Sequence, residues 1–389
     1  MDMSKAFDMV KWSELFSTLL ERKINPLFLR LLLYIYKNQQ YTVKWGEETA
    51  LFFNVSNGVR QGGVSSGIFF VVYIDKLLIL LRESGLGCTI HGVFYGAVIY
   101  ADDIFLLSAS RTGLQEMINI SQNFVTKLNL RFGTNSNPEK SKTKCIAFSK
   151  KRRPIQPLKP IILDGHPLPW VQQVKHLGHT LQVDNSMKID VNLKRGAFIG
   201  KVNSILQEFH YADSNVLMKL IIVYSCSMYG SNSWDLFSPE CQKLYRIYNI
   251  TLRTVNGIPR TTHKYLLESL TGHPHLFVQL LSRYVTFSKS LLKSNSFPVR
   301  FLAKVCLSDM RSVLGRTIAQ LAKMLKKPND IDLLYAYEVK KIINYAELPQ
   351  SEEWRIGLIR DMKNILNNEI YLGLNHSEAT RILEFGCTS

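Results

Sequence analysis

Apolar residues recur at helical spacing along the early part of the chain, and prolines, glycines and polar clusters separate the runs. Residues 10–37 predict two helices divided by Pro26, because proline ends one helix and suits the first turn of the next. A third helix is predicted over residues 66–84. Thr112 and Gln115 have the spacing of a capping box, which predicts the start of a further helix.

Runs rich in β-branched and aromatic residues lie between these helices and predict strands. Residues 41–45 and 50–55 flank Gly46-Glu47-Glu48-Thr49, a pattern typical of a hairpin. Residues 89–100 and 104–108 predict two further strands. Shorter strands are expected at residues 144–148, 161–163 and 174–181.

Strand signals become rare after about residue 185. Glycine, proline and asparagine near residues 230, 257, 272 and 328 divide a series of apolar runs with helical spacing. A chain of 389 residues exceeds the size at which one hydrophobic core usually stops growing, so two or three domains are expected. The pattern predicts an α+β first part followed by an all-α remainder.

The charge balance of the chain bears on the kind of partner that it binds. Lys and Arg number 48 against 31 Asp and Glu, which gives a formal net charge of +17. Such a surplus favours a polyanionic partner, because each phosphate that a protein neutralises releases counterions. A basic protein without any such partner is the alternative.

The spacing of the cysteines and the length of the apolar runs indicate the cellular compartment in which the protein is expected. The six cysteines form no C-x-x-C pair, which argues against structural zinc and against a secreted disulfide framework. No signal peptide opens the sequence, and the apolar stretches fall short of the roughly 20 residues of a membrane span. We therefore expect an intracellular protein with no membrane partner. Nucleus and cytoplasm stay open, since Lys150–Arg153 is either an import signal or a solvated loop, and the oligomeric state is not predicted.

The candidate chemistry begins at Tyr100-Ala101-Asp102-Asp103, which stands between two apolar strand-like runs. Adjacent carboxylates at the tip of a hairpin repel each other. A divalent metal removes this repulsion, since Mg²⁺ prefers carboxylate oxygen. An ordinary Asp-Asp turn is the alternative.

Four other strings accompany this turn in a fixed order. They are Asp2-Met-Ser-Lys-Ala-Phe-Asp8, Asn57-Gly-Val-Arg-Gln-Gly-Gly63, Asn137-Pro-Glu-Lys-Ser-Lys142 and His176-Leu-Gly178. With Tyr100–Asp103 they resemble motifs A to E of reverse transcriptases. Ser-Lys-Ala-Phe-Asp and Gly-Val-Arg-Gln-Gly-Gly are similar to the non-LTR (LINE-like, jockey-like) retrotransposons, whereas group II intron enzymes tend to carry Pro-Gln-Gly. The resemblance covers about residues 1–290.

This resemblance implies a right-hand polymerase palm, an antiparallel sheet with packed helices, followed by an all-α thumb. Residues 1–182 would be the palm with motifs A to E, residues 183–290 the helical thumb, and residues 291–389 a C-terminal helical region of unknown role. The fingers that precede motif A in the family are not in this sequence, so the strand of Asp2 is expected to be too short to pair stably. Gly67 replaces the family's proline and should loosen the start of its helix.

The resemblance also implies a metal site. Asp2 and Asp102 would be the principal ligands of two Mg²⁺ ions, with Mn²⁺ as a substitute, and Asp103 would support them. Lys140 would protonate the leaving pyrophosphate, although Lys142 and Lys144 are close enough to compete for that role. The alternatives are a terminal acid without a role at Asp2 and a solvated basic loop around the lysines.

Nucleotide and primer contacts follow from the same resemblance. Phe7 would lie under the sugar and exclude a ribose 2′-hydroxyl, Gln61 and Gly62 would contact the incoming dNTP, and Tyr100 would pack near the primer terminus. His176, Leu177 and Gly178 would form the turn of the primer grip. Core packing at Phe7 and a surface turn at Gln61 are the plainer alternatives.

Two functions from different classes result. The first is an RNA-directed DNA polymerase that transfers nucleotides from dNTPs to a DNA primer on an RNA template. The second is a catalytically inactive, truncated relic that only binds RNA or RNA–DNA duplex. A helical protein-interaction module is a third, weaker alternative.

Overall fold

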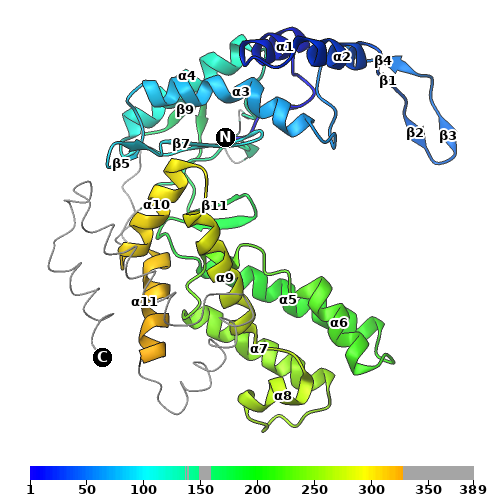
Figure 1. Cartoon of the computed structure of the whole chain (residues 1–389), viewed down its shortest axis with the longest axis vertical. Helices are drawn as coiled ribbons and strands as arrows, with labels where there is room; N and C mark the ends of the chain where they lie inside the picture. Colours follow the sequence, from blue (N-terminus) through cyan, green and yellow to red (C-terminus); the bar gives the residue numbers. More distant parts are fainter. Residues whose placement is uncertain (136, 138–139, 149–158, 327–389) are drawn as a thin grey trace. The chain divides into compact units, whose positions relative to one another are not determined.

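The computed structural model describes residues 1–135, 137, 140–148 and 159–326. The chain divides into two compact units, the first made of Met1–Ala147 with Arg153–Gln172 and the second of Phe148–Arg152 with Gln173–Ser389 (Figure 1). Each unit has its own hydrophobic core. The first combines helices with short antiparallel strands and the second is mostly helical, so the predicted α+β class is confirmed.

The four α-helices of the first unit lie where helices were predicted. They are α1 (Trp12–Glu21), α2 (Pro26–Lys37), α3 (Ser66–Glu83) and α4 (Arg111–Lys127). Pro26 is the first residue of α2, and the side chain of Asn25 accepts a hydrogen bond from the backbone N–H of Leu27 at 2.9 Å. Helix α3 forms the centre of this core with Phe70, Tyr73, Ile74, Leu77 and Leu81.

Charges interrupt the apolar sequence of α3 and tie the helix to α1. Lys76 pairs with Glu21 at 2.7 Å, and Asp75 pairs with Arg22, the residue after α1. Among the helices that the structure describes, none is long and apolar enough to cross a bilayer.

The strands of the first unit form antiparallel hairpins. They are β1 (Gln40–Tyr41) with β4 (Phe53–Asn54), β2 (Lys44–Trp45) with β3 (Glu48–Thr49), β5 (Thr89–Ile90) with β6 (Val93–Phe94), β7 (Ala97–Tyr100) with β8 (Asp103–Leu106), and β9 (Ile161–Leu163) with β10 (His166–Leu168). The hairpin predicted around residues 41–55 is confirmed, and Figure 1 shows it as an arm that extends beyond α2. Residues 89–100 do not form the single strand that was predicted. The left-handed backbone at His91 and Gly92 turns the chain there and separates β5 from β6.

Residues 1–4 form backbone hydrogen bonds on both sides, contrary to the expectation for so short a strand. On one side, the N–H of Ile104 donates to the carbonyl of Met1 at 2.9 Å. On the other side, Gly133 donates to the carbonyl of Asp2 at 2.8 Å, and Ser4 donates to Arg131 at 2.9 Å. Because the segment lies between two partners, four residues suffice to hold it.

Two local predictions were wrong. Thr112 does not cap α4; Ser110 does, and its side chain accepts from the N–H of Gly113 at 3.0 Å. The side chain of Gln115 instead makes two hydrogen bonds with the backbone of Ile162, each at 2.8 Å, so it joins α4 to β9. The strand expected over residues 144–148 is reduced to one bridge, between Cys145 and Trp170.

The second unit contains a hairpin and a series of helices around one core. The elements are β11 (Gln173–His176), β12 (His179–Gln182), α5 (Lys188–Glu208), α6 (Ser214–Ser225), α7 (Pro239–Val255), α8 (Leu267–Thr271), α9 (Leu276–Leu292), α10 (Phe297–Ser308) and α11 (Val313–Lys326). Trp234, Tyr248 and Tyr284 are among the largest fully buried side chains of the molecule. The single strand predicted over residues 174–181 is a hairpin, but the helical character after residue 185 is confirmed in the described part.

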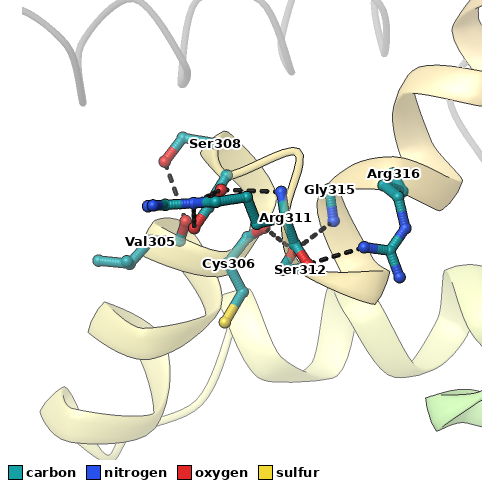
Figure 2. A network of polar contacts seen from close by, with 8 residues as sticks. Val305, Cys306, Ser308, Arg311, Ser312, Gly315 and Arg316 are labelled. Carbon is teal, nitrogen blue, oxygen red and sulfur yellow. Dashed lines mark hydrogen bonds and ion pairs between the residues drawn. The ribbon is translucent and has the colours of Figure 1, made fainter. Parts of the chain in front are cut away.

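A polar network closes the turn between α10 and α11 (Figure 2). The carboxylate of Asp309 accepts from the backbone N–H of Arg311 at 2.8 Å and from its guanidinium at 2.9 Å. These hydrogen bonds lower the pKa of Asp309. Ser312 caps α11 by accepting from the N–H of Gly315 at 2.8 Å. The helical unit therefore continues beyond residue 290, where a hydrogen-bonded turn joins α10 to α11.

A buried histidine begins α9. The ring Nδ1 of His275 accepts from the N–H of Phe277 at 3.2 Å, and its Nε2 lies 3.2 Å from the side-chain amide nitrogen of Asn249. Burial is the main cause that lowers the pKa of His275 to about 4, and the nearby charge of Lys264 adds to it. The cap needs an unprotonated Nδ1, so the folded unit requires a neutral ring.

We predict that acid destabilises the fold through His275. The unfolded chain protonates this residue near its ordinary pKa of 6.5 and the folded chain only near 4, so stability is lost as the pH falls through that window. The shift corresponds to at most about 3 kcal/mol. Urea unfolding at pH 7 and 4.5 should show a loss for the natural chain about 2 kcal/mol larger than for His275→Asn, which keeps a capping oxygen. Equal losses in both chains would contradict the prediction.

Candidate active site

The hairpin β7–β8 presents the predicted pair of aspartates. Tyr100 pairs with Asp103, so only Ala101 and Asp102 form the turn, and Ala101 has a left-handed backbone with φ of 51°. Such a conformation is uncommon for a residue other than glycine. Asp103 also forms a bridge with Asp2. The structure therefore brings the backbones of all three predicted aspartates together.

Negative charge accumulates at this point. Burial is the main cause that raises the pKa of Asp102, and the charges of Asp103 and Asp2 add to it, while Lys142 acts in the opposite direction. The Oδ2 atom of Asp2 is buried and has no hydrogen-bond partner. Lys142 places its ammonium 3.5 Å from this oxygen, which is an ion pair too long for a good hydrogen bond. Its exposed position weakens the compensation further.

These residues fit a hard divalent cation, the kind of ion that the resemblance to reverse transcriptases implies. In the described part of the chain, no group of three or more His, Cys, Asp or Glu side chains already stands in the arrangement of a metal cage. Ions such as Mg²⁺ do not need one, because they bind through one or two carboxylates together with waters and substrate phosphates. The unpartnered oxygen of Asp2 and the raised pKa of Asp102 are the features that a cation relieves.

The glycine-rich loop of residues 57–63 is bound to the segment that follows Asp2. Gly58 donates its N–H to the carbonyl of Val10, and Val59 donates to that of Phe7, both at 2.8 Å. The indole N–H of Trp12 donates to the carbonyl of Gly58 at 2.7 Å. Two of the predicted motifs, distant in the sequence, therefore form one backbone-linked substructure.

Glycine is required where these segments meet. Gly58 has φ of 86°, and a Cβ atom there would lie 2.9 Å from the carbonyl oxygen of Asp8. Gly62 also has a positive φ, of 78°, but has open space around it. Gln61 and Gly62 are exposed, and the side chain of Gln61 donates to the carboxylate of Asp8 at 3.1 Å. This exposed tip leaves room for a ligand to approach the backbone.

The two predicted aromatic residues have different surroundings. Phe7 is half-buried and stacks on Phe70 of α3, with ring centroids 4.9 Å apart. Core packing is thus part of its role, and its role at a sugar stays a prediction. Tyr100 is 65% exposed at the end of β7, so its ring is free to contact a partner.

The sequence reasoning missed two contacts of Asp2. Thr143 is buried, and its hydroxyl accepts from the N–H of Asp2 at 3.4 Å. Lys142 rather than Lys140 lies beside the carboxylate. A signal existed, because Ser141, Thr143 and Cys145 are buried while Lys142 and Lys144 are exposed, an alternation with a period of two. Lys140 is exposed and its role stays a prediction; Pro138 and Glu139 lie outside the described residues.

The predicted primer-grip residues lie in the second unit, at the turn between β11 and β12. His176 pairs with His179, so Leu177 and Gly178 form a two-residue turn. Both have positive φ, 46° and 79°, as in a type I′ hairpin turn. The turn that the motif predicts is present.

Comparisons with known proteins agree with the resemblance to reverse transcriptases. Residues 1–181 match the family model described as reverse transcriptase (RNA-dependent DNA polymerase). The chain is 27% identical over 185 residues to the Retrovirus-related Pol polyprotein from type-1 retrotransposable element R2 of Nasonia vitripennis, covering 47% of this chain and 17% of that protein. It is 26% identical over 156 residues to the corresponding polyprotein from type-2 element R2DM of Drosophila melanogaster, covering 40% and 14%.

A third relative is the Transposon TX1 uncharacterized 149 kDa protein of Xenopus laevis, which is 32% identical over 119 residues. That match covers 30% of this chain and 9% of the relative. The chain thus spans less than a fifth of the length of each of these relatives. Residues 1–181, which match the family model, contain the β7–β8 hairpin and the loop of residues 57–63.

We predict opposite effects for two glycine substitutions near the site. Gly58→Ala should lower the free energy of unfolding by about 2 kcal/mol, since the left-handed backbone disfavours a Cβ that would also meet Asp8. Gly67→Ala should raise it by about 0.5–1 kcal/mol, because Gly67 lies in the first turn of α3 and the added methyl would meet no atom within 4 Å other than those of its chain neighbours and of its own helix backbone. Urea unfolding of the three chains checks both, and a destabilised Gly67→Ala chain would refute the second.

Proposed function

We propose that this chain, whose residues 1–181 form a reverse transcriptase domain of the non-LTR retrotransposon kind, is an RNA-directed DNA polymerase. It extends a DNA primer on an RNA template with dNTPs. The observation that carries the proposal is the bridge of Asp2 with Asp103 beside the turn residue Asp102. Adjacent carboxylates of this kind are what two-metal nucleotidyl transfer requires.

In the proposed mechanism, Asp2 and Asp102 hold Mg²⁺, for which Mn²⁺ can substitute, and Asp103 supports them. When bound, the ions lower the pKa of the primer hydroxyl and stabilise the leaving pyrophosphate. Lys140 gives a proton to the pyrophosphate. Lys142, whose ammonium lies 3.5 Å from Asp2, limits the repulsion among the carboxylates before substrate arrives.

The incoming nucleotide lies between the aspartates and the glycine-rich loop. Phe7, supported from behind by Phe70, excludes a ribose 2′-hydroxyl by sterics. Gln61 and Gly62 contact the dNTP, and the exposed ring of Tyr100 packs near the primer terminus. Because Gly62 has open space around it, nucleotide can approach its backbone closely.

The larger parts have corresponding roles. Residues 1–182 are the palm and residues 183–290 the thumb, whose basic helices contact the phosphates of the RNA–DNA duplex. Of the region predicted over residues 291–389, residues 327–389 lie outside the described part of the chain. The net charge of +17 supports such contacts. The same charge favours the second candidate, a chain that binds RNA or RNA–DNA duplex without chemistry.

Primer extension tests the first function directly. The purified chain should extend oligo(dT) on poly(rA) with dTTP and Mg²⁺, and the double variant Asp102→Asn, Asp103→Asn should extend no primer, because amide groups cannot replace carboxylates as ligands of hard cations. The matched control is Asp164→Asn. That aspartate is exposed in the turn between β9 and β10, where asparagine tolerates the left-handed backbone.

Three outcomes separate the candidates. Extension by the natural chain and the control, but not by the double variant, supports the polymerase. Salt-sensitive retention of the template without any extension supports the inactive binding protein. Extension that survives in the double variant contradicts the assignment of the aspartates.

A further inference from the structure

One buried carboxylate joins three elements of the second unit. Asp190 lies in the first turn of α5 and is 1% exposed. Its Oδ1 accepts from the backbone N–H of Thr180 in β12 at 3.1 Å, and its Oδ2 accepts from the indole N–H of Trp234 at 2.9 Å. A carboxylate so deeply buried needs such partners, because burying an uncompensated charge is costly.

The β11–β12 turn packs against residues 228–234, here called the Tyr229 turn. A Cβ atom at Gly178 would lie 2.8 Å from the ring of Tyr229, and one at Gly230 would overlap the ring of His179. The rings of His179 and Tyr229 are 5.7 Å apart between centroids. Each turn therefore has a glycine where the other approaches most closely.

Both turns also contain backbone that only their surroundings can hold. Leu177 has φ of 46° and Met228 has φ of 40°, in a region that bulky side chains rarely occupy. Such conformations persist where neighbouring contacts over-determine them. Asp190 supplies contacts to both sides, because Thr180 follows the first turn closely and Trp234 ends the second.

The role of Asp190 extends beyond that of an acidic residue at a helix start. An exposed aspartate in the first turn would already interact favourably with the helix dipole. Asp190 is instead buried, and its hydrogen bonds leave α5 for two other elements. The Nδ1 atom of His179 lies 3.8 Å from Oδ2, which is beyond hydrogen-bond distance, so the carboxylate is committed to Thr180 and Trp234.

We propose that Asp190 is a positioning residue for the primer. By fixing β12 and the Tyr229 turn to α5, it holds His176, Leu177 and Gly178 in the conformation that meets the primer strand. The inference rests on the proposed polymerase function for its primer, but the coupling of the two turns through Asp190 stands on the hydrogen bonds alone. Asp190 itself does not touch the reacting atoms.

The test uses the full chain and two variants of equal chemistry. Asp190→Asn keeps the shape of the side chain but leaves one of its two donors without an acceptor. Asp309→Asn is the matched control, because its carboxylate accepts hydrogen bonds inside the turn between α10 and α11. Each variant removes one carboxylate from the second unit, and only the first should affect the hairpin.

Hydrogen exchange measures the positioning without any need for activity. In Asp190→Asn, the amides of residues 173–182 should exchange about tenfold faster, since a hydrogen bond to a charged group is lost, while those of α9 stay as in the natural chain. In primer extension, the KM for primer–template should rise about tenfold and the KM for dTTP should change less than twofold. Asp309→Asn should leave the hairpin exchange and both KM values unchanged.

Two results would overturn the inference. One is unchanged exchange of the hairpin in Asp190→Asn, and the other is equal acceleration throughout the second unit, which would indicate a general loss of the core. A KM for dTTP that rises as much as that for primer would refute the link to the primer. If the natural chain extends no primer, the polymerase proposal fails by itself, and exchange still decides whether Asp190 holds the turn.

Discussion

The backbone pairing of residues 1–4 is the interaction on which the candidate chemistry of the first unit depends. This short segment bonds to Ile104 on one side and to Arg131 and Gly133 on the other. The pairing sets the register that places Asp2 opposite Asp103. A shift of one residue would send every side chain of the segment to the other face and separate the carboxylates.

This register has an electrostatic cost, because it brings the carboxylates close together. Burial and neighbouring carboxylates raise the pKa of Asp102, and Asp2 keeps a buried oxygen without a hydrogen bond. Lys142 offsets the charge only from an exposed position. Local violations of good packing and satisfied polarity are expected where a protein keeps a functional site. A cation held by these carboxylates, as proposed for the site, would remove this cost.

Glycines allow separate segments to approach each other in both units. Gly58 admits the backbone of Asp8, and in the second unit Gly178 and Gly230 admit the rings of Tyr229 and His179. Residues that stand out as motif members therefore also serve packing.

The sequence by itself determined the helices α1 to α3, the turns of the β2–β3 and β7–β8 hairpins and the motif order, because these follow from local periodicity and from residues such as Pro26 that restrict their own backbone. Only the tertiary structure decided which distant groups meet. It paired Asp2 with Asp103, chose Lys142 over Lys140 as the neighbour of Asp2, and buried Asp190 under β12. Such contacts join residues far apart in the chain, so they depend on strand register and packing, which no local pattern encodes.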